Sequence, residues 1–432
     1  MKIKFLVTIA AVIPLISYAV EPLTLSKALE LVDSSPRNSA LRSEVRSAEG
    51  RLLSASGAFM PQVNVLERYV RTDDPVGVFG GKLQQGKFTA QDMAINNLNH
   101  PNAINNWVTR AEITQPVLHS TTDLYRRGAA SHQLDLVKQM SGFERESLRL
   151  DVVSLYYQAV AYREKARVLK EAIYSMKALE ASYEQASAPS SANETNYIVA
   201  KSVRSDLESQ LVRVETMGDN TKRCLTALLG IKDTEGVELT DSIPEAQRSF
   251  NEGPSTSDTR GDVKAAEAIY KAAISEHKSA KSTFGPNIDL FAAYNRYTGD
   301  FKSSDGSYEA GMLFSWPIFS GERFGKVKEA NANRAAARDN FEAMKLKAEA
   351  EKENSAQRLN ACIEQYKLNK KATDEAAKAL KLARQRYMEG TLPLLDYSQT
   401  IQNWAMISLR LVDSRYSVAE SDANKKFQTG DL

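Results

Sequence analysis

The chain has 432 residues, of which 42% are hydrophobic and 25% charged, a composition typical of a folded protein long enough for two or three domains. Its 56 Lys and Arg residues against 54 Asp and Glu residues leave a formal net charge of +2. This balance provides no electrostatic reason to expect an acidic partner, and we exclude nucleic acid as a ligand.

The first 19 residues are typical of a secretory signal peptide. Two lysines precede an apolar run over residues 5–16, and a small-x-small cleavage site ends at Ala19. About 12 apolar residues are too few for the roughly 20 that span a bilayer, which argues against a membrane anchor. No later stretch is apolar over a spanning length, so a mature membrane protein with this sequence would cross the bilayer as β-strands.

The remainder of the sequence repeats once. Residues 59–65 (FMPQVNV) match residues 284–290 (FGPNIDL), and residues 114–120 match residues 315–321. Each half predicts a helix, a strand, a loop, a strand, a very long helix, a short turn and a long returning helix. The predicted domains are a first repeat at 20–229, a polar linker or equatorial segment at 230–261, and a second repeat at 262–432.

Four segments alternate with the period of two that a strand requires, and one face of each is mostly apolar. Glu67 interrupts an apolar face and is expected to mark a bulge or a barrel rim. The strands are predicted at about residues 61–70, 107–116, 286–297 and 308–317. Aromatic side chains near their ends suit the two membrane interfaces: Tyr69, Trp107, Tyr294, Tyr308 and Trp316.

The same alternation is also expected of a half-buried sheet in a soluble protein. Export of the chain and the lack of any layer to cover a sheet favour the membrane interpretation. Four strands are too few to close a membrane barrel, which needs about eight. Strands that span a membrane must therefore come from several chains that share one barrel.

The long helices carry heptads. From Val152 to Tyr183 apolar residues recur at spacings of 4 and 3, interrupted only by Glu180, as in a coiled-coil seam. Comparable stripes on the other long segments predict two α-hairpins per chain. A helix over residues 121–187 would be roughly 100 Å long, which suits a tube across the periplasm or, alternatively, a coiled-coil scaffold.

Catalytic chemistry is not indicated. The four histidines show no metal-ligand spacing. The Gly81–Phe88 segment approaches a phosphate-binding loop, but Phe88 stands where Ser or Thr would hold magnesium, so we interpret it as an extracellular loop. We predict no enzyme activity, cofactor or metal. Cys224 and Cys362 are expected to be small packed side chains, with a single disulfide between them left open.

Three segments carry a family resemblance: residues 24–29 (TLSKAL), residues 59–63 (FMPQV) and residues 386–397 (RYMEGTLPLLDY). Together with the repeat, they make the mature chain resemble the TolC-like outer-membrane efflux family over its whole length. The resemblance implies a mixed, mainly α fold. Long α-hairpins would form an α-helical barrel, and four strands from each chain would close a shared 12-stranded transmembrane β-barrel in a homotrimer.

The resemblance also implies a function. The protein would be a channel in the outer membrane, surrounded by its lipid, with a helical extension into the periplasm. It would be the exit duct of a tripartite system, coupled to a periplasmic adaptor (membrane fusion) protein and an inner-membrane transporter. Efflux of small toxic compounds and type I protein secretion both fit. The alternative is a soluble periplasmic coiled-coil scaffold or adaptor protein.

The functional residues implied by the resemblance lie at the two hairpin tips, at about residues 184–196 and 388–396. The adaptor-contact tip comprises Arg386, Gly390, Thr391, Leu392 and Pro393. The periplasmic gate comprises Tyr183, Asn196, Tyr387, Asp396 and Gln399. Asn196 stands where the second half has Asp396, and Gln399 stands where relatives often carry Asp, so the acidic constriction is weaker than in the family. For the two tyrosines, gating and ordinary seam packing are equally compatible with the heptads.

Overall fold

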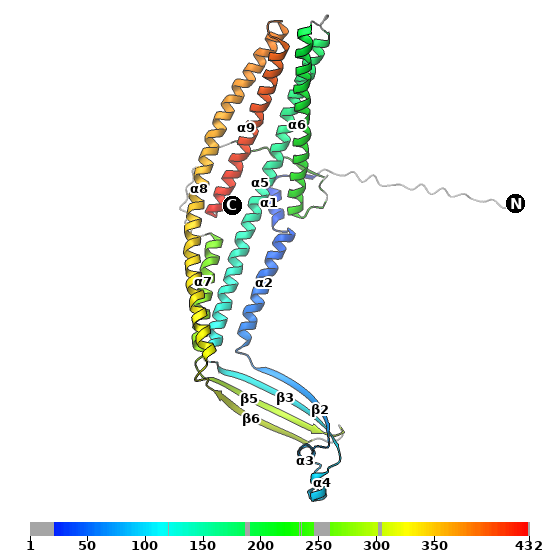
Figure 1. Cartoon of the computed structure of the whole chain (residues 1–432), viewed down its shortest axis with the longest axis vertical. Coiled ribbons are helices and arrows are strands. Elements are labelled where there is room, and N and C mark those ends of the chain that lie inside the picture. The colour runs from blue at the N-terminus through cyan, green and yellow to red at the C-terminus, as the bar shows by residue number, and fades with distance from the viewer. Residues whose placement is uncertain are drawn as a thin grey trace, which may run out of the picture. The chain divides into compact units, whose positions relative to one another are not determined.

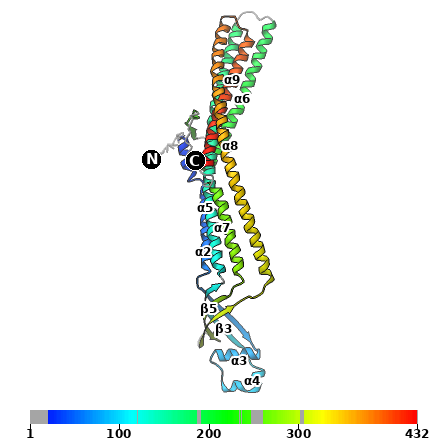
Figure 2. The same cartoon turned by 90° about the vertical axis from the view of Figure 1, so that its left-hand side faces the viewer.

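The computed structural model describes residues 21–119, 121–185, 191–232, 234, 236–245, 260–300 and 305–430 (Figures 1 and 2). The predicted signal peptide lies outside these residues, as do the first hairpin turn at 186–190 and much of the predicted linker. The chain forms two compact units, and each draws on both sequence repeats. We call them the helical unit (residues 1–42, 141–260 and 346–432) and the sheet unit (residues 43–140 and 261–345).

Two helical hairpins and a short parallel strand pair make up most of the helical unit. The hairpins run side by side, and the turn between α8 and α9 lies at the same end as the last residues of α5 and the first residues of α6 (Figure 1). The first consists of α5 (Thr122–Gln185) and α6 (Ser191–Leu229), and the second of α8 (Gly321–Met388) and α9 (Leu394–Thr429). The first part of α5, up to residue 140, and the first part of α8, up to residue 345, belong to the sheet unit. The unit also contains β1 (Glu21–Leu23), α1 (Leu25–Val32), the start of α2 (Pro36–Gly57) and β4 (Val237–Leu239).

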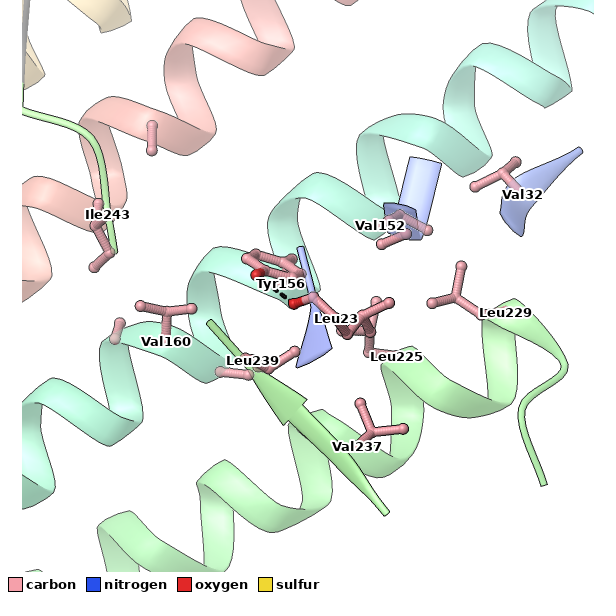
Figure 3. Packing of buried hydrophobic residues seen from close by; sticks show 14 of the residues in the cluster. Leu23, Val32, Val152, Tyr156, Val160, Leu225, Leu229, Val237, Leu239 and Ile243 are labelled. Atoms are coloured by element: carbon pink, nitrogen blue, oxygen red, sulfur yellow. Dashed lines mark hydrogen bonds between the residues drawn. The ribbon is translucent and has the colours of Figure 1, made fainter. Parts of the chain in front are cut away.

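The main core of the helical unit surrounds Tyr156 of α5 (Figure 3). The Tyr156 hydroxyl donates to the backbone carbonyl of Leu23 in β1 at 2.8 Å, and burial raises the pKa of Tyr156 to about 12. β1 pairs in parallel with β4, which brings Leu239 to the same cluster. The residues that follow the predicted signal peptide and part of the predicted linker are therefore both packed against the long helices.

A second core follows the coiled-coil seam of α5. Leu169 and Met176 are fully buried there against α6 and α9. Glu180, which interrupts the heptads, is also buried, and its carboxylate accepts a hydrogen bond from Arg204 of α6 at 2.8 Å. Arg204 also donates to Glu208 at 2.8 Å, so the buried acid is neutralised within the hairpin.

The sheet unit contains four antiparallel strands in the order β2-β3-β5-β6. Figure 2 shows α3 and α4 at one end of the strands and α2 and α7 at the other. The strands are β2 (Gln62–Thr72), β3 (Ile104–His119), β5 (Asn287–Thr298) and β6 (Asp305–Ser315). The rest of the unit includes α3 (Pro75–Gln84), the 3₁₀ helix η1 (Ala90–Met93), α4 (Ile95–Asn99) and α7 (Gly261–Ser282).

Three sequence-based interpretations need correction. The register of β2 against β3 is continuous past Glu67, and the irregularity of this sheet lies between Pro116 and Leu118 instead. The segment between β2 and β3, where the sequence predicts a loop, is a folded lobe with helices. Within this lobe Lys82 donates a hydrogen bond of 2.6 Å to Asp92, which lowers the pKa of Asp92 to about 2. Cys224 is exposed and not packed.

Cys362 is half-buried beside Ser421, and both cysteines are free thiols in this structure.

In the part of the chain that the structure describes, no helix is apolar enough over a sufficient length to cross a bilayer.

Candidate functional site

The turn between α8 and α9 is a compact reversal built around Gly390. Its backbone φ is +74°, in the left-handed region that favours glycine. The Gly390 amide donates to the carbonyl of Tyr387 at 3.0 Å, and the Thr391 amide donates to that of Arg386 at 2.9 Å. These two bonds define a Schellman motif, and Pro393 occupies the N-cap of α9. The predicted tip is thus held by its own backbone.

A cluster of apolar side chains lies beneath this turn. The rings of Tyr387 and Tyr397 stack with centroids 5.2 Å apart, and burial raises the pKa of Tyr397. Leu392 is half-buried against the same cluster. The other predicted tip residues are exposed: Arg386, Gly390, Thr391 and Pro393. A protein partner can therefore reach both a positive charge and the backbone of the turn.

The first hairpin repeats this arrangement with different residues. Tyr183 near the end of α5 stacks on Tyr197 of α6, with centroids 4.7 Å apart. The Tyr183 hydroxyl is buried and has no hydrogen-bond partner within the described residues. Tyr387 instead hydrogen-bonds to Ser182 of the first hairpin at 3.0 Å, which links the two hairpins beside their turns. Both predicted gate tyrosines therefore pack within one chain.

The polar members of the predicted gate are placed differently. Asp396 and Gln399 are exposed and lie almost one turn apart on α9, whereas Asn196 is half-buried on α6. Within the described residues Asp396 has no ion-pair partner. Each chain thus presents one unneutralised carboxylate beside its second tip.

One face of the sheet is mostly apolar, apart from Glu67 and Arg296, and the described residues leave it uncovered. Strand pairing aligns Val65, Ala111, Tyr294 and Tyr308 in one row across the four strands. The neighbouring row is Val63, Ile113, Ala292 and Ala310. Val65 is 72% exposed and Met312 on the same face is 63% exposed. A contiguous exposed apolar surface of this kind needs a partner or a lipid environment.

The opposite face carries a charged network centred on Arg110 of β3. Its guanidinium lies 2.8 Å from Glu112 and 2.5 Å from Glu309 of β6. It also donates to the side chain of Asn295 in β5 at 3.3 Å. The two faces therefore suit different surroundings, one apolar and one aqueous.

The predicted interfacial aromatics occur at different levels along the strands. Tyr69 and Trp107 pair near the lobe that contains α3 and α4, with ring centroids 4.6 Å apart. Trp316 follows β6 at the helix end, where its indole donates to the Phe284 carbonyl at 3.0 Å. Tyr294 and Tyr308 lie between these levels. Tyr69, Trp107 and Trp316 lie near the ends of the strands, where membrane-spanning strands commonly carry aromatic side chains, whereas Tyr294 and Tyr308 do not.

Sequence reasoning missed an acidic pair around His119. Its Nδ1 lies 2.7 Å from Asp123 in the first turn of α5, and its Nε2 lies 2.8 Å from Asp289 of β5. The spacing of four residues to Asp123 was visible in the sequence, but the approach of Asp289 depends on strand register. This cluster ties β5 to the junction of β3 and α5.

Comparisons with known proteins agree with this architecture. Residues 255–424 match the model of the outer membrane efflux protein family. The *Campylobacter jejuni* CmeC outer membrane channel is 17% identical, with a TM-score of 0.81, and the match covers 94% of this chain and 85% of that one. No curated protein matches the sequence significantly.

Two further solved structures share the fold. A membrane protein from *Pseudomonas aeruginosa* is 15% identical with a TM-score of 0.80, and the match covers 94% of this chain and 93% of that one. The open state of the Neisseria gonorrhoeae MtrE outer membrane channel is 14% identical with a TM-score of 0.80, and the match covers 94% of this chain and 89% of that one.

Proposed function

We propose that the chain is a member of the outer membrane efflux protein family, whose model matches residues 255–424, and that it forms the exit channel of a tripartite export system. Its strands contribute to a barrel in the outer membrane, and its helical hairpins extend into the periplasm. The sheet supports this function over that of a soluble periplasmic scaffold, because a soluble protein would have to cover the apolar face.

The exposed apolar face is the observation that carries the proposal. Val65, Tyr308 and Met312 all lie on it, while the Arg110 network occupies the other face. Lipid facing the first surface and water facing the second is the pattern of a transmembrane barrel. An edge strand with unpaired backbone N–H and C=O groups is not tolerated in lipid, so β2 and β6 must pair with strands of other copies of the chain.

The number of copies is proposed from the family resemblance. Four strands per chain fall short of the roughly eight that close a membrane barrel, and the family resemblance implies a 12-stranded barrel in a trimer. The prediction is a homotrimer in which β2 of one copy pairs with β6 of the next. Mass measurement of the detergent-extracted protein tests this directly, since a monodisperse monomer in the membrane extract would exclude a shared barrel.

The tips of the hairpins form the periplasmic end of this channel. The exposed turn around Gly390, with Arg386 beside it, is the contact site for a periplasmic adaptor protein, which in turn connects to an inner-membrane transporter. Support comes from the rigidity of the turn, because a surface fixed by its own backbone loses little entropy on binding. The cargo is small toxic compounds or proteins secreted by the type I route.

The resting gate lies at the same end. The Ser182–Tyr387 hydrogen bond holds the two hairpins together, and Asp396 supplies one carboxylate per chain to the aperture. Single-channel recording in lipid bilayers tests both roles. Tyr387→Ala should raise conductance, and Asp396→Asn should lower cation preference, because fewer negative charges then line the bore. Unchanged conductance and selectivity in both variants would leave only packing roles.

The channel function itself is tested in cells. The protein should fractionate with the outer membrane, and a deletion strain should lose an export activity that the intact gene restores. Two assays on the deletion strain separate the two cargo classes. Poorer growth than the parent on toxic compounds indicates efflux, and loss of secreted proteins indicates type I secretion. Recovery of the whole protein in the soluble periplasmic fraction would support the scaffold alternative instead.

A further inference from the structure

A cationic pocket in the sheet unit is lined by residues of α7 and α8 and by Phe284, which precedes β5. Its cavity volume is about 480 Å³. The basic residues in its lining are His277, Lys281, Lys328 and Arg334, and no carboxylate is among the lining residues. Two lysines and an arginine without an acid indicate a site for an anion.

The charges in this pocket are not neutralised by any described residue. Lys281, Lys328 and Arg334 form no ion pair within the described ranges. His277 is only 6% exposed, and its ring has no hydrogen-bond partner in the same part of the chain. Burial, together with the charges of Lys281 and Arg334, lowers the pKa of His277. A bound anion would offset the repulsion that these groups exert on one another.

An apolar rim adjoins the pocket on the side of the strands. Phe324 lines the pocket and also packs near Phe319 and Phe284, with centroids 6.2 and 5.0 Å away. Ile318 and Phe319 are 82% and 80% exposed. The side chain of Trp316 lies at the same junction, bonded to the Phe284 carbonyl. The site therefore offers an anion pocket and an apolar surface to one ligand.

From this juxtaposition we infer that the pocket binds the phosphate headgroup of an anionic phospholipid in the periplasmic leaflet of the outer membrane. The inference rests on the proposed function, which puts the strands in the membrane and the start of α8 at its periplasmic surface. Lys328 and Arg334 hold the phosphate oxygens, and the acyl chains lie along Phe319 and Ile318. A free phosphate ion would use the cationic half of the site only.

Native mass spectrometry of the full-length oligomer tests the inference. The purified protein is reconstituted in vesicles of phosphatidylcholine with phosphatidylglycerol and then released in mild detergent, and the bound lipids are counted. Wild-type protein should retain phosphatidylglycerol in preference to phosphatidylcholine. Lys328→Gln and Arg334→Gln should each lower that retention roughly fivefold, the effect expected for one cation beside an anionic headgroup.

Lys326→Gln is the matched control, because Lys326 is two residues from Lys328 but lies outside the pocket and pairs with Glu322 at 2.5 Å. It should retain the lipid at the wild-type level. Equal retention in the control and both pocket variants would overturn the inference. Binding of inorganic phosphate by a protein that shows no preference for phosphatidylglycerol would also overturn it, since the pocket would then be a site for a free anion.

The same preparation separates this inference from the proposed function. Membrane fractionation and oligomeric mass are measured on every variant before lipids are counted. A wild-type chain that fails to reach the outer membrane contradicts the proposed function. A membrane-embedded oligomer without preference for phosphatidylglycerol contradicts only the lipid site.

Discussion

The cores of the two units differ in where they find their partners. In the helical unit, Tyr156 and Leu225 are fully buried by residues of the same chain. In the sheet unit, side chains that are just as apolar, such as Val65 and Met312, remain largely exposed. The hydrophobic content of a segment alone therefore does not distinguish a core that is buried within one chain from an apolar surface that needs lipid or another copy to cover it.

The comparison also separates two sources of stability. Burial in the helical unit contributes to folding of a single chain, because the seams of its helices close on one another. The apolar face of the sheet becomes stabilising only in lipid, and the edge strands only against other copies. Substitutions in the two units should consequently be read out by different measurements.

The largest effect is expected in the core of the helical unit. Leu225→Ala leaves a cavity beside Tyr156 and should lower the free energy of unfolding of the helical unit by about 2 to 5 kcal/mol. Val212→Ala, on the same helix but 65% exposed, is the matched control and should change little. Thermal unfolding monitored by circular dichroism measures both. Equal melting temperatures for the Leu225→Ala and Val212→Ala variants would contradict the view that this core is buried by residues of the same chain.

A charge on the apolar face of the sheet should act at the membrane instead. Val65→Arg should reduce outer-membrane assembly at a cost of about 2 to 4 kcal/mol if the residue is near the bilayer midplane. Leu66→Arg is the control, because its side chain projects from the other face, where Glu112 and Glu309 already neutralise Arg110. The amount of oligomer in the outer membrane is the measurement, and equal losses would contradict the assignment of the faces.

A smaller effect is expected at the second tip. An added β-carbon at Gly390 meets no heavy atom within 4 Å, so strain comes only from its φ of +74°. Forcing a β-branched residue into that conformation costs about 1 to 2 kcal/mol, whereas Asn tolerates it better. Gly390→Val should therefore abolish export without preventing assembly, and Gly390→Asn should retain most export. Full export by the Val variant would place the adaptor contact elsewhere.

The smallest effect concerns pH and His277. Its pKa in the folded state is lowered from 6.5, so the unfolded chain binds the proton more readily. The sheet unit should accordingly keep its full stability above pH 6.5 and lose some as the pH falls below that value. His277→Gln should flatten this dependence in denaturant titrations at several pH values. An unaltered pH profile would mean that other groups dominate it.

Several features of the protein follow from local sequence alone. Alternation with a period of two predicted the places of β2, β3, β5 and β6, because pleating puts successive side chains on opposite faces. Heptads predicted the seam of α5, and Gly390 predicted a tight turn after α8. These signals survive in a single sequence because each depends on residues only a few positions apart.

The remaining features depend on residues far apart in the chain, and tertiary structure decided them. Pairing of β1 with β4 joins the residues after the predicted signal peptide to the predicted linker, and the buried Glu180 is acceptable only because α6 supplies Arg204. Register brings Asp289 to His119, and the approach of α7 to α8 gathers four basic residues at one pocket. A periodic sequence pattern does not predict such long-range contacts, because the packing of whole helices and strands determines which residues come together.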